Sequence, residues 1–478
     1  MDAFRPRLRP EVTLSQQPDG TLALVDRVMN RGIALDHAGV AIARRLDGTH
    51  TVDELFAAVA DAAPRATLEQ ALRGLLLVNA VEGAGDDIAE RMRALSAGEA
   101  EYGARVLPEA RFACQGSGEC CRGYSFGPLT EGDLTRLAGL DIAGTYPHLG
   151  PGPYTTERDG KHYLRKNGEA CMFVLPDQRC SLHAAFGADS KPAFCRLYPI
   201  RITPTLAGLK MYDNGECATF AVSSSAGRPL TEEVPRLRAL LPPGRLHIHH
   251  PMVELREGVV CDYGHYERLE AILCEVAAQA PDTGIALRVI GHLAQRFIDR
   301  VSSCALAAGE PDQTINDAMS EPISLEAAPD PRALTRVGTV TALLERAARD
   351  EAATQPSAIA TVLLGHLADA LARVHGAVRS GRPPAPPPAG MDDMLRRSLR
   401  YLLFSQRALI DGRLRPALLR IALTHLVVLA GSRGDLSFAH MVAMRTLRMG
   451  FARRLFHAYA DDAFAALDAA STIWPSIH

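Results

Sequence analysis

Hydrophobic and polar positions alternate in three short runs near the N-terminus, and this pattern predicts three β-strands. The runs cover Val12–Ser15, Thr21–Val25 and Gly32–Leu35. A period of two places every second side chain on the same face of a strand. Between the first two runs, Pro18-Asp19-Gly20 has the residue types of a tight turn.

The apolar positions then recur every three or four residues, which is typical of helices packed through one face. Three helices are predicted over His37–Leu46, Val52–Ala60 and Leu68–Leu77. Polar residues with the spacing of helix caps precede them: Asp36, Thr51 with Glu54, and Thr67 with Gln70. The order predicts a small domain of three strands and three helices over residues 1–90.

No single period persists from Leu107 to about Phe220, so this part is expected to be irregular with short elements. In chain order we expect a helix capped by Thr130 and Asp133, a loop over Tyr146–Gly160, and strands at His162–Leu164 and Cys171–Leu175 around a polar turn, Lys166–Glu169. These segments belong to a second predicted domain, residues 105–225.

Helical periodicity dominates residues 228–478, which form the third predicted domain and are expected to be all-helical. The expected helices are Glu232–Leu241, Tyr266–Ala280, Ile285–Leu306, Ala333–Ala352, Ala358–Arg379, Asp392–Ile410, Pro416–Ala430 and Ala439–Ala470. The proline-rich run Arg382–Gly390 predicts a linker or surface loop. The expected fold class is therefore α+β and mostly α.

The composition limits the classes of protein to which this chain can belong. The net charge of −3 over 478 residues argues against a nucleic-acid-binding protein. The apolar run Ile421–Ala430 is shorter than the roughly 18 residues of a membrane helix. The first ten residues lack an apolar signal core, so we expect a cytoplasmic protein without a membrane partner. Thiols stay reduced in that compartment.

Seven of the ten cysteines fall within about a hundred residues, and two of them are adjacent. They are Cys114, Cys120, Cys121, Cys171, Cys180, Cys195 and Cys217. Neighbouring thiols can hardly bridge each other, but both can face a metal. Thiolates favour zinc or iron–sulfur clusters. Buried thiols that act as small apolar groups are the plainer alternative, and the zinc-ribbon C-x-x-C signature is absent.

Several segments carry a resemblance to a known family: FACQGSGECCRGYSFGPLTEGDLTRL, CMFVLPDQRCSLH, AFCRLYPIRI and NGECATF. They resemble the YkgJ-type cysteine-cluster family of zinc- or iron-chelating proteins, and within it the flagellin lysine-N-methylase branch. The broader family often opens with an additional cysteine that this chain lacks. The resemblance implies that the seven cysteines are metal ligands, in one four-iron cluster with spare thiols or in two centres.

The N-terminal segments resemble a second family. LRPEVTLSQ, ALDHAGVAIARRLDGTHTVDELFAAVA and LRGLLLVNAVEG are similar to the PqqD-like winged-helix element, which recognises leader peptides in ribosomal-peptide modification systems. Such modules add the peptide as a strand to a sheet edge. The resemblance implies a groove formed by Gly32, Ile33, Ala34, Leu35, Leu68, Ala71, Leu72 and Leu75. A small accessory domain that only packs on its neighbour is the alternative.

Other residues are weaker candidates for chemistry. Arg196 can grip an anion and Tyr198 can donate a proton or a hydrogen bond, although both can equally support a metal site. Alternative metal ligands are His183, His247, His249, and Cys261 with His265. All four lysines lie in the cysteine-rich region, which suggests an anionic ligand there: Lys161, Lys166, Lys191 and Lys210. Residues 391–454 hold twelve arginines and four aspartates. An acidic peptide, an anionic cosubstrate, or ion pairs along a solvated helix face would explain this excess of eight positive charges.

These features predict an iron–sulfur enzyme that modifies a peptide or protein, with a 4Fe-4S cluster. The methylase resemblance implies methyl transfer from S-adenosylmethionine, although no glycine-rich methyltransferase loop is visible. The alternative is a non-catalytic metal-chelating or metal-delivery protein with zinc or mononuclear iron, which binds a peptide partner in a ribosomal-peptide modification pathway. The substrate, the modified residue and the oligomeric state are left open by the sequence.

Overall fold

The structure is a computed structural model that describes residues 4–17, 20–27, 31–77, 80–82, 90–91, 93–95, 101–241, 252–256, 259–303, 331–380, 390–405, 409, 413–431 and 435–473. It is a mixed α+β structure of about 59% helix and 15% strand, so the prediction of a mostly helical α+β chain is confirmed. The predicted Pro-rich loop and His247 and His249 lie outside the described residues, except for Gly390.

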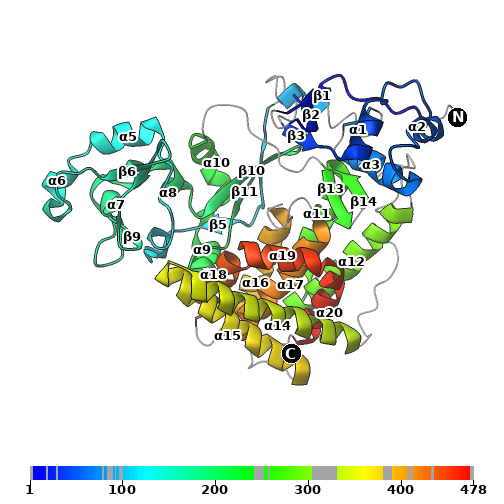
Figure 1. Ribbon diagram of the computed structural model, residues 1–478. Helices are drawn as coiled ribbons and strands as arrows, with labels where there is room; N and C mark the ends of the chain where they lie inside the picture. Colours follow the sequence, from blue (N-terminus) through cyan, green and yellow to red (C-terminus); the bar gives the residue numbers. More distant parts are fainter. Residues whose placement is uncertain are drawn as a thin grey trace.

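The N-terminal part contains the predicted three strands followed by three helices, drawn in blue in Figure 1. They are β1 Val12–Gln16, β2 Leu22–Asp26, β3 Arg31–Ala34, α1 His37–Ala43, α2 Val52–Ala58 and α3 Arg65–Leu77. The strands form an antiparallel sheet in the order β1-β2-β3. Leu24, Ile42 and Leu55 are fully buried in a core that belongs to this part alone.

The capping predictions hold for two of these helices. Asp36 accepts a hydrogen bond from Gly39 N, and Thr51 and Glu54 form the predicted capping box. The third prediction was wrong, because α3 begins two residues before Thr67. Pro64 O accepts the first helical hydrogen bond from Leu68 N at 3.1 Å, so the proline marks the start.

The cysteine-rich part consists of short elements, as predicted. They are β4 Ala104–Val106, β5 Arg111–Phe112, η1 Glu119–Cys121, α5 Glu131–Ala138, α6 Ile142–Thr145, η2 Pro147–Leu149, β6 Thr155–Arg158, β7 Lys161–Leu164, β8 Lys166–Asn167, β9 Ala170–Cys171, α7 Ser181–Phe186, η3 Ala188–Ser190 and α8 Ala193–Leu197. The box of Thr130 and Asp133 caps α5 as expected.

The predicted strand pairing in this part was wrong. β7 pairs with β6, which lies in the segment expected to be a loop. The segment predicted as a turn contains strand β8, which Gly168 and Glu169 join to the equally short β9. Three of the four β6 residues are exposed, so the strand has almost no apolar positions through which a period could show.

The longest strands of the region were missed. β10 Ile200–Thr205 and β11 Gly208–Asp213 form a hairpin, and β4 adds to β11 in parallel. All six residues of β11 are buried, so the strand lacks the alternation of a half-exposed one. Leu209 and Met211 belong to the core of the helical part, which anchors the hairpin there.

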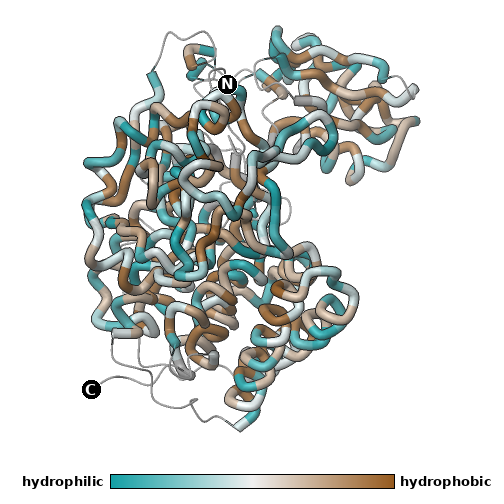
Figure 2. The backbone as a smooth tube through the Cα atoms, turned by 90° about the vertical axis from the view of Figure 1, so that its left-hand side faces the viewer, coloured by the Kyte–Doolittle hydropathy of each residue, from teal (hydrophilic) through white to brown (hydrophobic). Residues whose placement is uncertain are grey.

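Helices dominate the rest of the chain. The elements are α9 Phe220–Ala226, β12 Arg228–Pro229, α10 Leu230–Arg238, β13 Met252–Arg256, β14 Val259–Asp262, α11 Tyr263–Gln279, α12 Thr283–Ser303, α14 Pro331–Thr354, α15 Ala358–Ser380, α16 Met391–Phe404, α17 Leu414–Gly431, α18 Leu436–Thr446, α19 Gly450–Ala458, η4 Ala460–Asp462 and α20 Ala463–Ile473. The prediction of an all-helical C-terminal region was wrong, because β13 and β14 form an antiparallel hairpin within it. In Figure 2, hydrophobic and hydrophilic positions alternate along the helical tubes, as expected for helices with one buried face.

The predicted helix Ala439–Ala470 is three helices, because the chain leaves helical geometry at Met449 and again at Tyr459. Among the residues that the structure describes, two helices, α15 and α17, are long and apolar enough to cross a membrane, whereas the sequence analysis had found no apolar run of that length. The apolar window of α17 is 89% buried inside the fold, which is typical of a core helix. These two helices are not enough to indicate a membrane protein.

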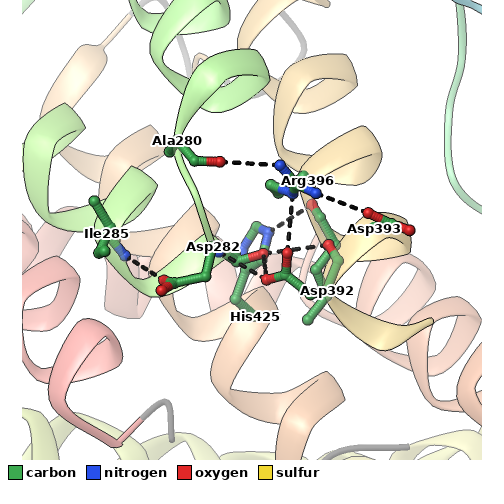
Figure 3. A network of polar contacts seen from close by, with 9 residues as sticks. Ala280, Asp282, Ile285, Asp392, Asp393, Arg396 and His425 are labelled. Atoms are coloured by element: carbon green, nitrogen blue, oxygen red, sulfur yellow. Dashed lines mark hydrogen bonds and ion pairs between the residues drawn. The ribbon is translucent and has the colours of Figure 1, made fainter. Parts of the chain in front are cut away.

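A polar network fixes the turn between α11 and α12 against α16 (Figure 3). Asp392 Oδ1 accepts hydrogen bonds from Thr283 N and Thr283 Oγ1, both at 2.7 Å. Arg396 pairs with Asp392 Oδ2 at 2.9 Å and donates to Ala280 O at 2.9 Å. The buried His425 lies beside this network and contacts Leu395 O. Charge pairs and backbone groups thus lock three helices together at one point.

Candidate metal centre

Five thiols from four separate segments line one cavity of about 370 Å³, which we call the thiol cavity. They are Cys120, Cys121, Cys171, Cys180 and Cys195. The remaining wall is largely apolar and includes Phe126, Phe173 and Phe194, and Lys191 lines it as a cation. A soft set of sulfur donors in a largely apolar shell, with the cations Lys191 and Arg201 adjacent, suits a thiophilic metal group.

Glycines in left-handed conformation shape the loop that carries the adjacent pair. Gly118 has φ of +70°, and a Cβ there would lie 2.6 Å from Gln178 O. The loop therefore approaches the turn at Gln178 more closely than any side chain would permit. Arg122 Nη2 donates to Gln178 Oε1 at 2.5 Å and Cys121 N donates to Gly118 O at 2.9 Å, which closes the turn.

The adjacent thiols have the spacing of two ligands of one ion. Cys120 Sγ and Cys121 Sγ lie 3.7 Å apart, and two thiolates at 2.3 Å from a tetrahedral zinc would be about 3.8 Å apart. In the described part of the chain, however, no group of three or more Cys, His, Asp or Glu is arranged to hold a single metal ion.

The protonation of the thiols is uneven. The hydrogen bond between Cys120 and Cys121 lowers the pKa of Cys120 to about 7 and raises the pKa of Cys121, and Lys191 further favours the Cys120 thiolate. Burial raises the pKa of Cys171 to about 12. Burial also lowers the pKa of Lys191, but the neighbouring thiolates, that of Cys195 first, outweigh it and raise the net value. Lys191 thus stays charged beside the sulfurs.

Two of the seven predicted ligands lie outside the cavity lining. Cys114 is exposed, although it is near enough to Lys191 to interact with its charge. Cys217 Sγ lies 3.2 Å from Thr219 Oγ1, and the charge of Cys120 acts on it. The structure therefore brings five of the seven together and leaves two at the margin. The role of all seven as ligands stays a prediction.

The two catalytic candidates have different surroundings. Tyr198 lines the thiol cavity, and its hydroxyl donates to Glu216 O at 2.8 Å. Burial raises its pKa, so the phenol stays protonated and acts as a hydrogen-bond donor. Arg196 instead pairs with Asp189 Oδ1 at 3.4 Å and is not among the residues that line the cavity. The other candidates, His183, Cys261 and His265, also lie outside that lining.

Arginines from the helical part reach the edge of the thiol cavity. Arg445 donates to Glu216 O at 3.3 Å and lies over the Tyr124 ring, 4.8 Å from its centroid. Arg448 pairs with the Glu216 carboxylate, which also accepts from Tyr124 Oη at 3.1 Å. Helix α18 and the segment after it thus hold the loop that follows β11 and leads into Cys217.

A second, larger cavity of about 640 Å³ adjoins the first, and we call it the polar cavity. Arg201 and Ile202 line both cavities. The polar cavity is further lined by Asp213, Asn214, Glu216, Tyr212, Tyr401, Ser398, Arg420, Arg448 and Arg453, among others. Four arginines thus face two carboxylates.

The floor of the polar cavity contains buried polar atoms without a partner. Asp213 is 2% exposed; its Oδ1 accepts from Gly215 N at 2.8 Å, but its Oδ2 has no hydrogen-bond partner in the described structure. The same holds for Asn214 Nδ2. Burial raises the pKa of Asp213 to about 7. Such groups are costly to bury unless something pairs with them.

The chain matches no protein-family model, no curated protein and no solved structure. The likeness to cysteine-cluster proteins therefore stays a resemblance carried by the quoted residues.

The predicted peptide groove is partly exposed. Gly32 and Ala34 are exposed on β3, which is an edge strand of its sheet. Ile33, Leu35 and Ala71 are partly buried, whereas Leu68, Leu72 and Leu75 are buried in the core of the N-terminal part. Of the eight residues, the strand residues are thus the accessible ones. The groove itself stays a prediction.

Sequence reasoning missed the polar cavity. Its lining comes from β10, β11, the following loop and helices about 200 residues later, so no short motif contains it. Two signals were present: the NGEC segment and the excess of arginine. Several of those arginines form ion pairs, namely Arg396, Arg400, Arg413, Arg415 and Arg448.

Proposed function

We propose that the protein is an iron–sulfur enzyme that modifies a side chain of a peptide or protein substrate. The observation that carries the proposal is the convergence of five cysteines on one cavity beside Lys191 and Tyr198. Four thiolates hold a 4Fe-4S cluster. The five cysteines that line the cavity are enough to supply four such ligands.

Bound there, a cluster would supply a Lewis-acidic or redox-active iron next to the substrate. The chain's own residues would do the rest. Lys191 would offset the negative charge of the thiolates, and the protonated phenols of Tyr124 and Tyr198 would orient the Glu216 loop through their hydrogen bonds. The apolar wall would exclude water.

The resemblance to lysine N-methylases supports methyl transfer as the reaction. In that reaction the amine nitrogen of the target lysine bonds to the methyl carbon of S-adenosylmethionine. The sulfonium carbon–sulfur bond breaks with its electron pair left on sulfur, and the amine releases one proton. Holding both reactants in place would supply much of the rate.

The N-terminal part would deliver the substrate. Its three strands followed by three helices fit a winged-helix, PqqD-like module, and the exposed edge strand β3 offers the main-chain groups that strand addition needs. The nine described cysteines are all free thiols, which fits the cytoplasm as the compartment.

One observation favours the non-catalytic alternative, a metal-chelating or metal-delivery protein. The 3.7 Å spacing of Cys120 and Cys121 suits a single exchangeable ion. The two functions differ in substrate turnover. Full-length protein purified without oxygen would be incubated with S-adenosylmethionine and a peptide encoded beside its gene, and the peptide mass measured. A gain of one or more methyl groups is expected; an unchanged mass with a loaded centre would leave only the chelating function.

A further inference from the structure

The polar cavity is a candidate binding site, because it combines an anion-binding wall with a buried carboxylate. Its volume of about 640 Å³ lies within the range of pockets for small organic ligands. The described lining holds Arg201, Arg420, Arg448 and Arg453 against Asp213 and Glu216, so positive charge predominates. Arginine groups favour carboxylate or phosphate.

The second observation is the unpaired carboxylate oxygen. Asp213 is 2% exposed and is one of the residues that line the cavity, and its Oδ2 has no hydrogen-bond partner in the described structure. An ammonium or amino group of a ligand would supply the missing donor and offset the cost of burying the charge. Glu216, in contrast, is already engaged by Tyr124 and Arg448.

The ligand must therefore carry both kinds of group. We propose that the polar cavity binds a small molecule with an amino-carboxylate end, whose amino group donates to Asp213 Oδ2 and whose carboxylate lies against the arginines. Tyr212 and Tyr401 also line the cavity, so aromatic side chains are available to pack against a ring at the other end of the ligand.

The position of the cavity gives this ligand a role. Arg201 and Ile202 line both cavities, and the loop from Asp213 to Cys217 runs from one to the other. A molecule in the polar cavity would thus lie next to the thiol cavity. The assignment of this ligand as the group-donating cosubstrate rests on the proposed function. The assignment of the cavity as a site that binds an amino-carboxylate through Asp213 does not.

The test is equilibrium binding to full-length protein, with metal content measured on the same sample. The probes are S-adenosyl-L-homocysteine, which has the amino-carboxylate end, and 5′-methylthioadenosine, which lacks it. The first should bind at least tenfold more tightly. Asp213→Asn keeps the acceptor for Gly215 N but replaces Oδ2 by a donor, so it should weaken the first probe at least tenfold. Arg453→Ala should weaken it too.

Arg349→Ala is the matched control, since Arg349 lies on α14, forms ion pairs with Glu345 and Asp369, and does not line the cavity. This variant should bind S-adenosyl-L-homocysteine as tightly as the wild type does. Equal binding of both probes, no binding, or unchanged affinity in Asp213→Asn and Arg453→Ala would overturn the assignment. If the probes bind as predicted but the protein contains no iron–sulfur centre, the binding site is supported and the proposed function is refuted. If the iron–sulfur centre is present but the probes do not bind as predicted, the site is refuted and the proposed function is not.

Discussion

Single residues hold the two cavities in place, and Gly215 is the clearest case. It has φ of +71°, and a Cβ there would lie 2.8 Å from His440 Cε1 and 3.0 Å from Met444 Cε. The residue lies between Asp213 and Cys217, in the loop shared by both cavities. Its backbone conformation and the lack of a side chain are both required.

Gly215→Ala should lower the free energy of unfolding by more than the strain of a left-handed alanine alone, which is about 1–2 kcal/mol. Gly116→Ala is the matched control, because Gly116 has φ of +70° but nothing lies within 4 Å of its Cβ position. Denaturant unfolding of both variants measures the difference. Equal losses of unfolding free energy in the two variants would show that the close contact with His440 does not contribute to the cost.

The titration of Asp213 should make the free energy of unfolding depend on pH. Burial raises its pKa from 3.8 to about 7, so the folded state binds this proton more tightly than the unfolded state. The resulting stability is fully present below about pH 4 and is lost as the pH rises to about 7.

Asp213→Asn removes this dependence. The difference in unfolding free energy should shift in favour of the variant between pH 4 and pH 8, by on the order of 4 kcal/mol at most, since one pKa unit corresponds to about 1.4 kcal/mol. Denaturant unfolding at several pH values measures it. A constant difference would mean that the carboxyl titrates normally in the fold.

At the scale of elements, polar contacts between helices that are distant in the sequence fix how these helices pack against each other. The network in Figure 3 is one such point. Asp392 and Asp393 both lie in the first turn of α16, so both favour the helix dipole equally. Only Asp392 also accepts from the buried Thr283, whereas the Asp393 side chain is 66% exposed.

Asp392→Ala should therefore destabilise the protein by about 1–3 kcal/mol, because it leaves the buried Thr283 N without its acceptor, while Thr283 Oγ1 keeps only the Asp392 backbone oxygen. Asp393→Ala should cost less than about 1 kcal/mol, as for an exposed ion pair. Thermal unfolding under equal conditions compares them. A cost for Asp393→Ala equal to that for Asp392→Ala would mean that the network does not hold the helices.

Periodicity sufficed for elements with one buried face. The strands and helices of the N-terminal part and most C-terminal helices were predicted within a few residues. It failed where that condition fails: β11 is buried on both faces, β6 is almost wholly exposed, and the breaks at Met449 and Tyr459 carry no strong local signal. The clustering of cysteines in sequence indicated the thiol cavity, but Arg445 and Arg448 reach it only through tertiary packing.

At the scale of the whole molecule, separate cores divide the chain into parts of unequal independence. The N-terminal part has its own core, and a small core that includes Phe126, Phe173 and Leu182 lies in the cysteine-rich part. The largest core belongs to the helices and to the β10–β11 hairpin. The small core adjoins the thiol cavity, so this part should depend most on a bound centre.

Removal of metal should therefore loosen one part only. Hydrogen exchange after chelation should become faster between residues 114 and 197 but stay unchanged in β1, β2 and α1–α3. The N-terminal part is the internal control, since none of the ten cysteines lies in it. Unchanged exchange in the cysteine-rich part would show that metal does not support its fold.

The most direct test of the central claim is the iron and acid-labile sulfide content of protein purified without oxygen, with and without Cys120→Ser and Cys121→Ser together. Cys274→Ser is the control, because Cys274 is a buried thiol on α11 that does not line the thiol cavity. We expect about four iron and four sulfide per chain in the wild type and the control, and a large loss of both in the double variant. Zinc without sulfide, or equal iron and sulfide in all three proteins, would contradict an iron–sulfur centre held by these cysteines.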